Sequence, residues 1–205
     1  MSAQTRAFLR LFSEEVRAAL VNPEETKRRW NSATEWSTLM VGSSETRKAG
    51  DFGVLGRIGR SLGYHLQAEY LRVDQIWYVL NPDSPDDWRI EAFLEHENNP
   101  KRLAETVRKL LELGAGLKVA ITYPPSAMKQ ELLDGVSRLI GQRYGTPPDS
   151  RVAVIFGFLD DSGSLVSWEA HELDGMGRIS SGAIEKTAAQ QGVAPGDRPR
   201  TAARG

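Results

Sequence analysis

Three acidic residues stand near the ends of two stretches whose composition is typical of β-strands. Asp74 lies near the start of RVDQIWYVL (72–80), and Glu95 and Glu97 close RIEAFLEHE (89–97). Strands favour β-branched and aromatic residues and disfavour carboxylates, so these acids need an explanation. Carboxylate oxygens without cysteine or converging histidine are ligands for hard divalent cations. The chemistry these residues could perform is therefore that of a Mg²⁺ or Mn²⁺ site.

The stretch NPDSPDDW (81–88) joins the two strands and is rich in turn-forming residues, so it predicts a hairpin. Opposed residues of an antiparallel hairpin have a constant index sum. A turn that joins 81 to 88 sets this sum at 169, which is also the sum for Asp74 and Glu95. We expect these carboxylates to face each other, with Cβ atoms about 4.5–5.5 Å apart. Strand alternation puts Glu97 on the same face and turns His96 to the other.

Like charges that face each other in a sheet repel, and three explanations stay open at this point. A cation can lie between them, they can share a proton, or they can be solvated at a wet sheet edge. The same count sets Arg72 opposite Glu97, so an ordinary cross-strand ion pair is an alternative to a metal site. Glu69, five residues before Asp74 at the end of an expected helix, is a candidate for a further ligand or for holding a metal-bound water.

Alternating helices and strands are expected to position these residues. Apolar periodicity predicts helices over 3–21, in pieces over 23–50, and over 54–71, 99–113 and 127–143, and strands over 72–80, 89–97, 117–123, 151–159 and 166–173, the last a half-exposed or edge strand. This order predicts an α/β domain in which helices cover a mixed sheet. We expect a helical N-terminal extension (1–50), an α/β core (51–175) and a partly disordered C-terminal extension (176–205) with a short helix near 182–191.

The composition limits the class of protein. The chain has 205 residues, 26% charged residues and a net charge of −1, which is unlike a strongly basic DNA-binding domain. It has no cysteine, which excludes disulfides and thiolate metal sites. No apolar run approaches the roughly 18 residues of a membrane span, and the N-terminus lacks the apolar segment of a signal peptide. We therefore expect a cytoplasmic protein with no membrane partner.

Four segments carry a resemblance to a known family. QAEYLRVD, FLEHENN, RLAETVRKLL and LKVAITY follow one another between about 55 and 123. In this order they resemble the PD-(D/E)XK nuclease superfamily, in which a helix precedes a hairpin that carries Asp and then Glu-x-Lys, followed by a helix and a further strand. The resemblance implies a restriction-endonuclease-like core. Asp74 and Glu95 match the metal-binding acids, Glu97 falls where lysine is usual, and Glu69 matches a glutamate of the first helix.

The resemblance implies a Mg²⁺- or Mn²⁺-dependent nuclease. Asp74 and Glu95 would hold the ion, with Glu97 and Glu69 completing the catalytic set. The partner would be nucleic acid, with DNA as the expected substrate. The oligomeric state stays open, with a homodimer as one candidate. Lys101, Arg102 and Lys109 would contact the nucleic acid, and Lys101 or Lys109 could replace the missing lysine. The alternative is a non-catalytic module that kept a nuclease-like fold and binds nucleic acid or a protein.

Overall fold

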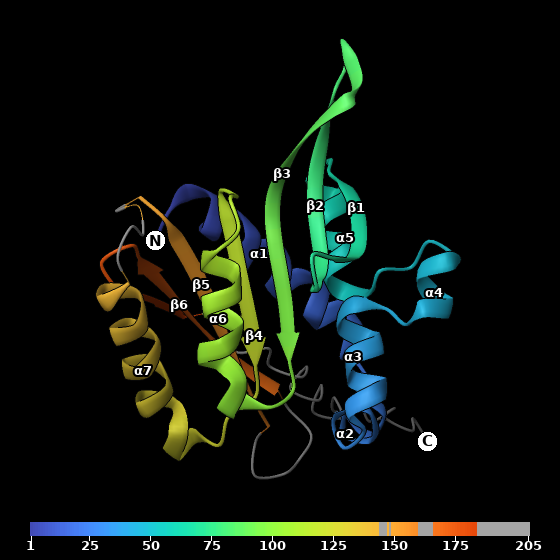
Figure 1. Ribbon diagram of the computed structural model, residues 1–205. Helices are drawn as coiled ribbons and strands as arrows, with labels where there is room; N and C mark the ends of the chain where they lie inside the picture. The colour runs from blue at the N-terminus through green and yellow to red at the C-terminus, as the bar shows by residue number, and fades with distance from the viewer. Residues whose placement is uncertain (144–146, 148, 160–165, 184–205) are drawn as a thin grey trace, which may run out of the picture.

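A mixed β-sheet lies between two layers of helices in the computed structural model, which describes residues 1–143, 147, 149–159 and 166–183 (Figure 1). The sheet order follows the chain order. Neighbouring strands are antiparallel except at the parallel β3–β4 and β4–β5 pairs. The predicted α/β class is confirmed. The strands within the described residues are β1 (His65–Tyr70), β2 (Val73–Asn81), β3 (Ser84–Glu97), β4 (Leu117–Thr122), β5 (Arg151–Leu159), β6 (Val166–Asp174) and β7 (Ile179–Ala183).

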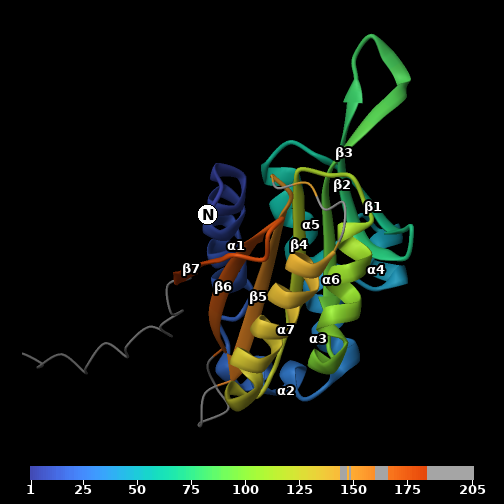
Figure 2. The same ribbon diagram turned by 60° about the vertical axis from the view of Figure 1, so that its left-hand side comes forward.

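The helices divide between the two faces of the sheet. Buried side chains of α6 and α7 pack on one face, and those of α1, α3 and α5 pack on the other (Figure 2). No helix of the described residues is long and apolar enough to cross a membrane. The helices are α1 (Ala3–Ala19), α2 (Pro23–Trp30), α3 (Ala33–Val41), α4 (Ser44–Lys48), α5 (Gly53–Ser61), α6 (Leu103–Leu111) and α7 (Lys129–Gln142), with short 3₁₀ turns at Pro100–Arg102 and Ser126–Met128.

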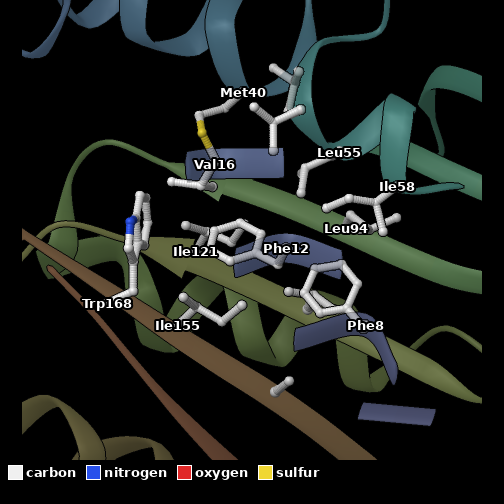
Figure 3. Close-up of a cluster of buried hydrophobic side chains, with 14 of the residues drawn as sticks. Phe8, Phe12, Val16, Met40, Leu55, Ile58, Leu94, Ile121, Ile155 and Trp168 are labelled. Atoms are coloured by element: carbon white, nitrogen blue, oxygen red, sulfur yellow. The ribbon is translucent and has the colours of Figure 1, made fainter. Parts of the chain in front are cut away.

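Helix α1 belongs to the same hydrophobic cluster as the sheet. The Ser2 side chain accepts a hydrogen bond from the backbone N–H of Thr5 and caps the helix, which satisfies one of its free donors. Phe8, Phe12 and Val16 follow one another at i, i+4 spacing and are all buried. They lie among side chains of α3, α5 and the central strands (Figure 3).

The β2–β3 hairpin has the predicted register beside the carboxylates, although its turn differs from the prediction. The pairs Gln75–Leu94, Ile76–Phe93 and Trp77–Ala92 all have the index sum of 169. The predicted turn over 81–88 is wrong, because β3 begins at Ser84 and the hairpin extends beyond the body of the molecule (Figure 1). Two register shifts along the hairpin bring the sum from 165 at Asn81–Ser84 to 168 and then to 169.

The predicted helix over 54–71 is wrong beyond Ser61. Gly63 has φ of 81° just after α5, and the chain then forms β1. The segment HLQAEY alternates between exposed and half-buried residues and pairs with β2. The sheet therefore overrides the i, i+4 helical stripe that Leu66 and Tyr70 would continue from Leu62.

The C-terminal part of the sheet differs from the prediction as well. β6 is not an edge strand, because β7 pairs with it and takes the edge of the described sheet. Residues 182 and 183 of the expected helix near 182–191 end β7, and the others lie outside the described residues.

Candidate active site

The three carboxylates of Asp74, Glu95 and Glu97 lie on the α6 face of the sheet. Their strand neighbours Ile76 and Phe93 belong to the hydrophobic cluster on that face. The pairing count that joins Gln75 to Leu94 sets Asp74 opposite Glu95, one position further. Glu95 is buried, and Asp74 is half-buried. The hairpin therefore brings two carboxylates from neighbouring strands together beneath the edge of α6.

His96 lies on the other face, as strand alternation predicts. Its Nε2 is 2.7 Å from the hydroxyl oxygen of Tyr123, and its Nδ1 is 3.5 Å from the Ser37 hydroxyl. Burial lowers the pKa of His96 to about 3, so the ring is neutral at physiological pH. The imidazole is separated from the carboxylates by the sheet, but the backbone N–H of His96 donates to Oδ2 of Asp74 at 2.7 Å.

The electrostatics of the site favour a cation. The pKa of Glu95 is raised from 4.5 to about 7: burial is the largest cause, the charge of Asp74 adds to it, and Lys109 opposes both effects. Burial also raises the pKa of Asp74, against the His96 hydrogen bond and the charge of Lys109. Glu97 raises the pKa of both acids. Because burial disfavours the ionised form of both acids, a positive charge beside them stabilises their carboxylates, and Lys109 supplies part of that stabilisation.

Lys109 of α6 reaches the carboxylates from outside the hairpin. Its ammonium group forms an ion pair with Oε1 of Glu95 and donates a hydrogen bond to the backbone oxygen of Arg72 at 2.7 Å. The resemblance in sequence implied a lysine at position 97, where this chain has glutamate. One of the two lysines that were expected to replace it therefore lies against Glu95. Lys101 is exposed and does not line the pocket described below.

Glu97 and Glu69 have partners different from those expected. Glu97 accepts a hydrogen bond from the backbone N–H of Asn99 at 2.8 Å and lies 3.7 Å from the Arg102 guanidinium. The alternative ion pair between Glu97 and Arg72 is not formed.

Glu69 is not on a helix but in β1, where it has φ of 56° and forms an ion pair with Arg47. It does not line the pocket, so the expectation of a helical glutamate beside the carboxylates is wrong.

A polar pocket of about 580 Å³ opens at the carboxylates. Arg102, Glu105, Lys109 and Glu112 recur at helical spacing along α6 and its two caps and line the pocket, so the sequence contains a signal for this polar stripe. Arg72 and Arg108 were also missed as site residues. The lining residues are Arg72, Asp74, Glu95, His96, Glu97, Asn98, Arg102, Glu105, Thr106, Arg108, Lys109 and Glu112.

The donor set fits an ion that takes few protein ligands. Mg²⁺ is usually bound through one or two carboxylates together with waters and substrate phosphates. Asp74 and Glu95 supply two carboxylates on one face of the sheet. Among the described residues, no group of three or more His, Asp or Glu side chains is arranged to hold a metal ion. Asp74 and Glu95 are therefore the two residues that could hold such an ion, and the described residues form no all-protein metal cage.

Comparison with known proteins gives little further information. No family model matches this chain, and no curated protein matches it in sequence. Among solved structures, the central domain of yeast acetyl-CoA carboxylase matches with 10% sequence identity and a TM-score of 0.34. The alignment covers 63% of this chain and 26% of that one. A similarity of this size carries no argument about function.

Proposed function

We propose that this protein is a metal-dependent nuclease that hydrolyses phosphodiester bonds, with DNA as the expected substrate. The observation that carries the proposal is the convergence of Asp74, Glu95 and Lys109 from two strands and a helix in one polar pocket. The order of helix α5, hairpin β2–β3, helix α6 and strand β4 also supports it, since these elements follow one another in the superfamily that the sequence resembles, although β1 stands between α5 and the hairpin here.

Each residue has a role that its surroundings support. Asp74 and Glu95 would hold Mg²⁺ or Mn²⁺, which supplies a Lewis acid for a phosphate oxygen and lowers the pKa of a bound water. Glu97, held by the Asn99 N–H, would orient the attacking water and accept its proton. Lys109, oriented by the Arg72 carbonyl, would offset negative charge that develops on the phosphate in the transition state. The burial of Glu95 and the partial burial of Asp74 strengthen these electrostatic interactions, because a low dielectric screens charge less.

Cleavage assays with matched variants test the proposal. The full chain is incubated with plasmid, linear duplex and single-stranded DNA, and with RNA, in Mg²⁺, in Mn²⁺ or in EDTA. We expect metal-dependent cleavage that Asp74→Asn and Glu95→Gln reduce at least ~100-fold, because each removes a charge that holds the ion. Lys109→Met should lower the rate by roughly 10²–10³, as for loss of one transition-state contact.

Glu131→Gln is the control, because Glu131 is exposed on α7 and is not part of the pocket. It should cleave at the wild-type rate. The proposed nuclease activity would be refuted if the wild type cleaved no substrate, or if Glu95→Gln cleaved as fast as the wild type.

One observation favours a second candidate, a nucleic-acid-binding module without catalysis. The Glu95 carboxylate already has a cation in Lys109, and Glu97 has one in Arg102, so the acids have partners without a metal. Binding of nucleic acid in EDTA that Mg²⁺ does not alter, together with an absence of cleavage, would support this candidate.

A further inference from the structure

The β1–β2 turn has a sequence that does not suit its backbone. Tyr70 pairs with Val73, so Leu71 and Arg72 form a two-residue hairpin loop. Both have positive φ, 51° for Leu71 and 64° for Arg72. Two-residue loops with this pattern strongly prefer Asn-Gly, because the Cβ atom of most other residues crowds the backbone at positive φ. A leucine and an arginine there hold the turn in a conformation that is costly for both residues.

Packing does not account for these two residues. Leu71 is 55% exposed, although leucine is usually buried. Arg72 is exposed too, and in the part of the chain that the structure describes its guanidinium makes no hydrogen bond or ion pair. Strain of this kind persists where it serves a functional site, and the surrounding sheet can enforce it.

The turn lies beside the candidate active site. Arg72 lines the pocket, and Asp74 is two residues further along β2. The backbone oxygen of Arg72 accepts the hydrogen bond from Lys109 that orients its ammonium group. The turn therefore contributes in two ways: its backbone positions Lys109, and the Arg72 side chain lines the pocket next to the exposed Leu71.

We propose that the Leu71–Arg72 turn is a substrate-binding element of this site. The scissile phosphate of the nucleic acid lies at Asp74 and Glu95, and the Arg72 guanidinium binds the neighbouring phosphate of the same nucleic-acid strand. Arginine suits this role because it forms paired hydrogen bonds with phosphate oxygens. Leu71 packs against the adjoining sugar or base, as apolar side chains do where a protein meets unstacked bases. This inference rests on the proposed nuclease function and makes the substrate a strand that extends past the scissile phosphate along β1.

The double substitution Leu71→Asn with Arg72→Gly tests it, because Asn-Gly suits this turn and keeps the carbonyl that orients Lys109. Binding of labelled single-stranded and duplex DNA of about 20 nucleotides is measured by fluorescence anisotropy in EDTA, between about 50 and 200 mM salt. We expect an unchanged or higher melting temperature and a dissociation constant raised roughly 3–10-fold. The slope of log affinity against log salt should become shallower by about 1, the effect of losing one phosphate contact.

Further variants separate the contributions of charge and backbone. Arg72→Lys should bind more tightly than the double variant but more weakly than the wild type, because an ammonium group keeps the charge but lacks the two-pronged geometry of a guanidinium. Arg138→Ala removes one positive charge from the exposed side of α7 and should leave affinity and salt slope unchanged.

The two proposals fail in different ways. If the wild type binds and cleaves while the double variant has the same affinity and salt slope, the role of the turn is refuted and the nuclease stands. If the wild type neither binds nor cleaves nucleic acid, the nuclease is refuted and the turn proposal with it. A lower melting temperature of the double variant would contradict the strain on which the turn proposal is based.

Discussion

At the scale of the residue, the pKa of Glu95 is the property of the site that can be tested most directly. Glu95 faces Asp74 from β2, Glu97 from its own strand and Lys109 from α6. Burial and the two acids favour its protonated form, and Lys109 favours its ionised form. An ionised Glu95 is therefore unfavourable in the folded protein, which links the stability of the fold to pH.

We expect Glu95→Gln to change this link. Because the pKa of Glu95 rises from 4.5 to about 7 on folding, the folded state binds more protons between these values, and the wild type loses stability as pH rises through this window. Glutamine cannot ionise. The stability of the variant relative to the wild type should increase by roughly 1–3 kcal/mol between pH 4.5 and 8.

Urea unfolding of both proteins across this pH range measures the difference. Glu131→Gln, on exposed α7, should show no such trend. A constant difference between Glu95→Gln and the wild type would contradict a raised pKa for Glu95.

At the scale of the element, the glycines of α5 allow the helix to lie close to the sheet. The sequence suggests close packing because Gly56, Gly59 and Gly63 weaken a helix without obvious reason. In the structure a Cβ at Gly59 would come within 2.7 Å of Nε1 of Trp77 and within 2.6 Å of Cδ2 of Leu66. The missing side chain is what brings α5 against β1 and β2.

Two glycine substitutions should therefore have opposite effects. Gly59→Ala should destabilise the protein by about 1–3 kcal/mol, because the added methyl group displaces the buried Trp77 ring. Gly135→Ala in α7 meets no atom within 4 Å and should stabilise it by up to ~1 kcal/mol through helix propensity. Chemical denaturation measures the free energy of unfolding of both variants. Equal effects of the two substitutions would contradict this account of the α5 packing.

At the scale of the whole molecule, the N-terminal helix and the sheet share one hydrophobic cluster. Phe12 is fully buried, and its ring meets the Trp168 ring of β6 edge-on, with centroids 5.0 Å apart. The ring centroids of Phe8 and of Trp77 in β2 are 5.8 Å apart. Helix α1 thus contacts strands from both halves of the chain, so its loss would expose much of one face of the sheet.

We expect Phe12→Ala to lower the free energy of unfolding of the whole protein by about 3–5 kcal/mol, because it leaves a cavity beneath α1. Arg10→Ala, on the exposed side of the same helix, should change it by less than about 0.5 kcal/mol. Tryptophan fluorescence and far-ultraviolet circular dichroism should report one coincident transition. An early separate transition in Phe12→Ala would show instead that α1 unfolds independently of the sheet.

The sequence was sufficient for much of this structure where the signals were local. Asn99 and Pro100 mark the beginning of the α6 region, and the stripe of Leu103, Val107 and Leu110 is buried as its spacing predicts. The apolar run 151–159 forms a central strand, as expected for a strand covered on both faces. It was insufficient at HLQAEY, where Leu66 and Tyr70 continue the i, i+4 stripe of a helix but pairing with β2 makes the segment a strand.

By itself, the sequence determined the α/β class and the shared face of Glu95 and Glu97, because strand alternation depends on residue number alone. Only the tertiary structure decided the rest of the site. Two register shifts in the β2–β3 hairpin bring Asp74 opposite Glu95 despite the different turn. The structure also brings Lys109 to Glu95, sends Glu69 to Arg47, and places Arg72 of the β1–β2 turn in the lining of the pocket. Contacts between elements depend on how α6 and the β1–β2 turn pack against the hairpin, and no spacing within one element encodes that packing.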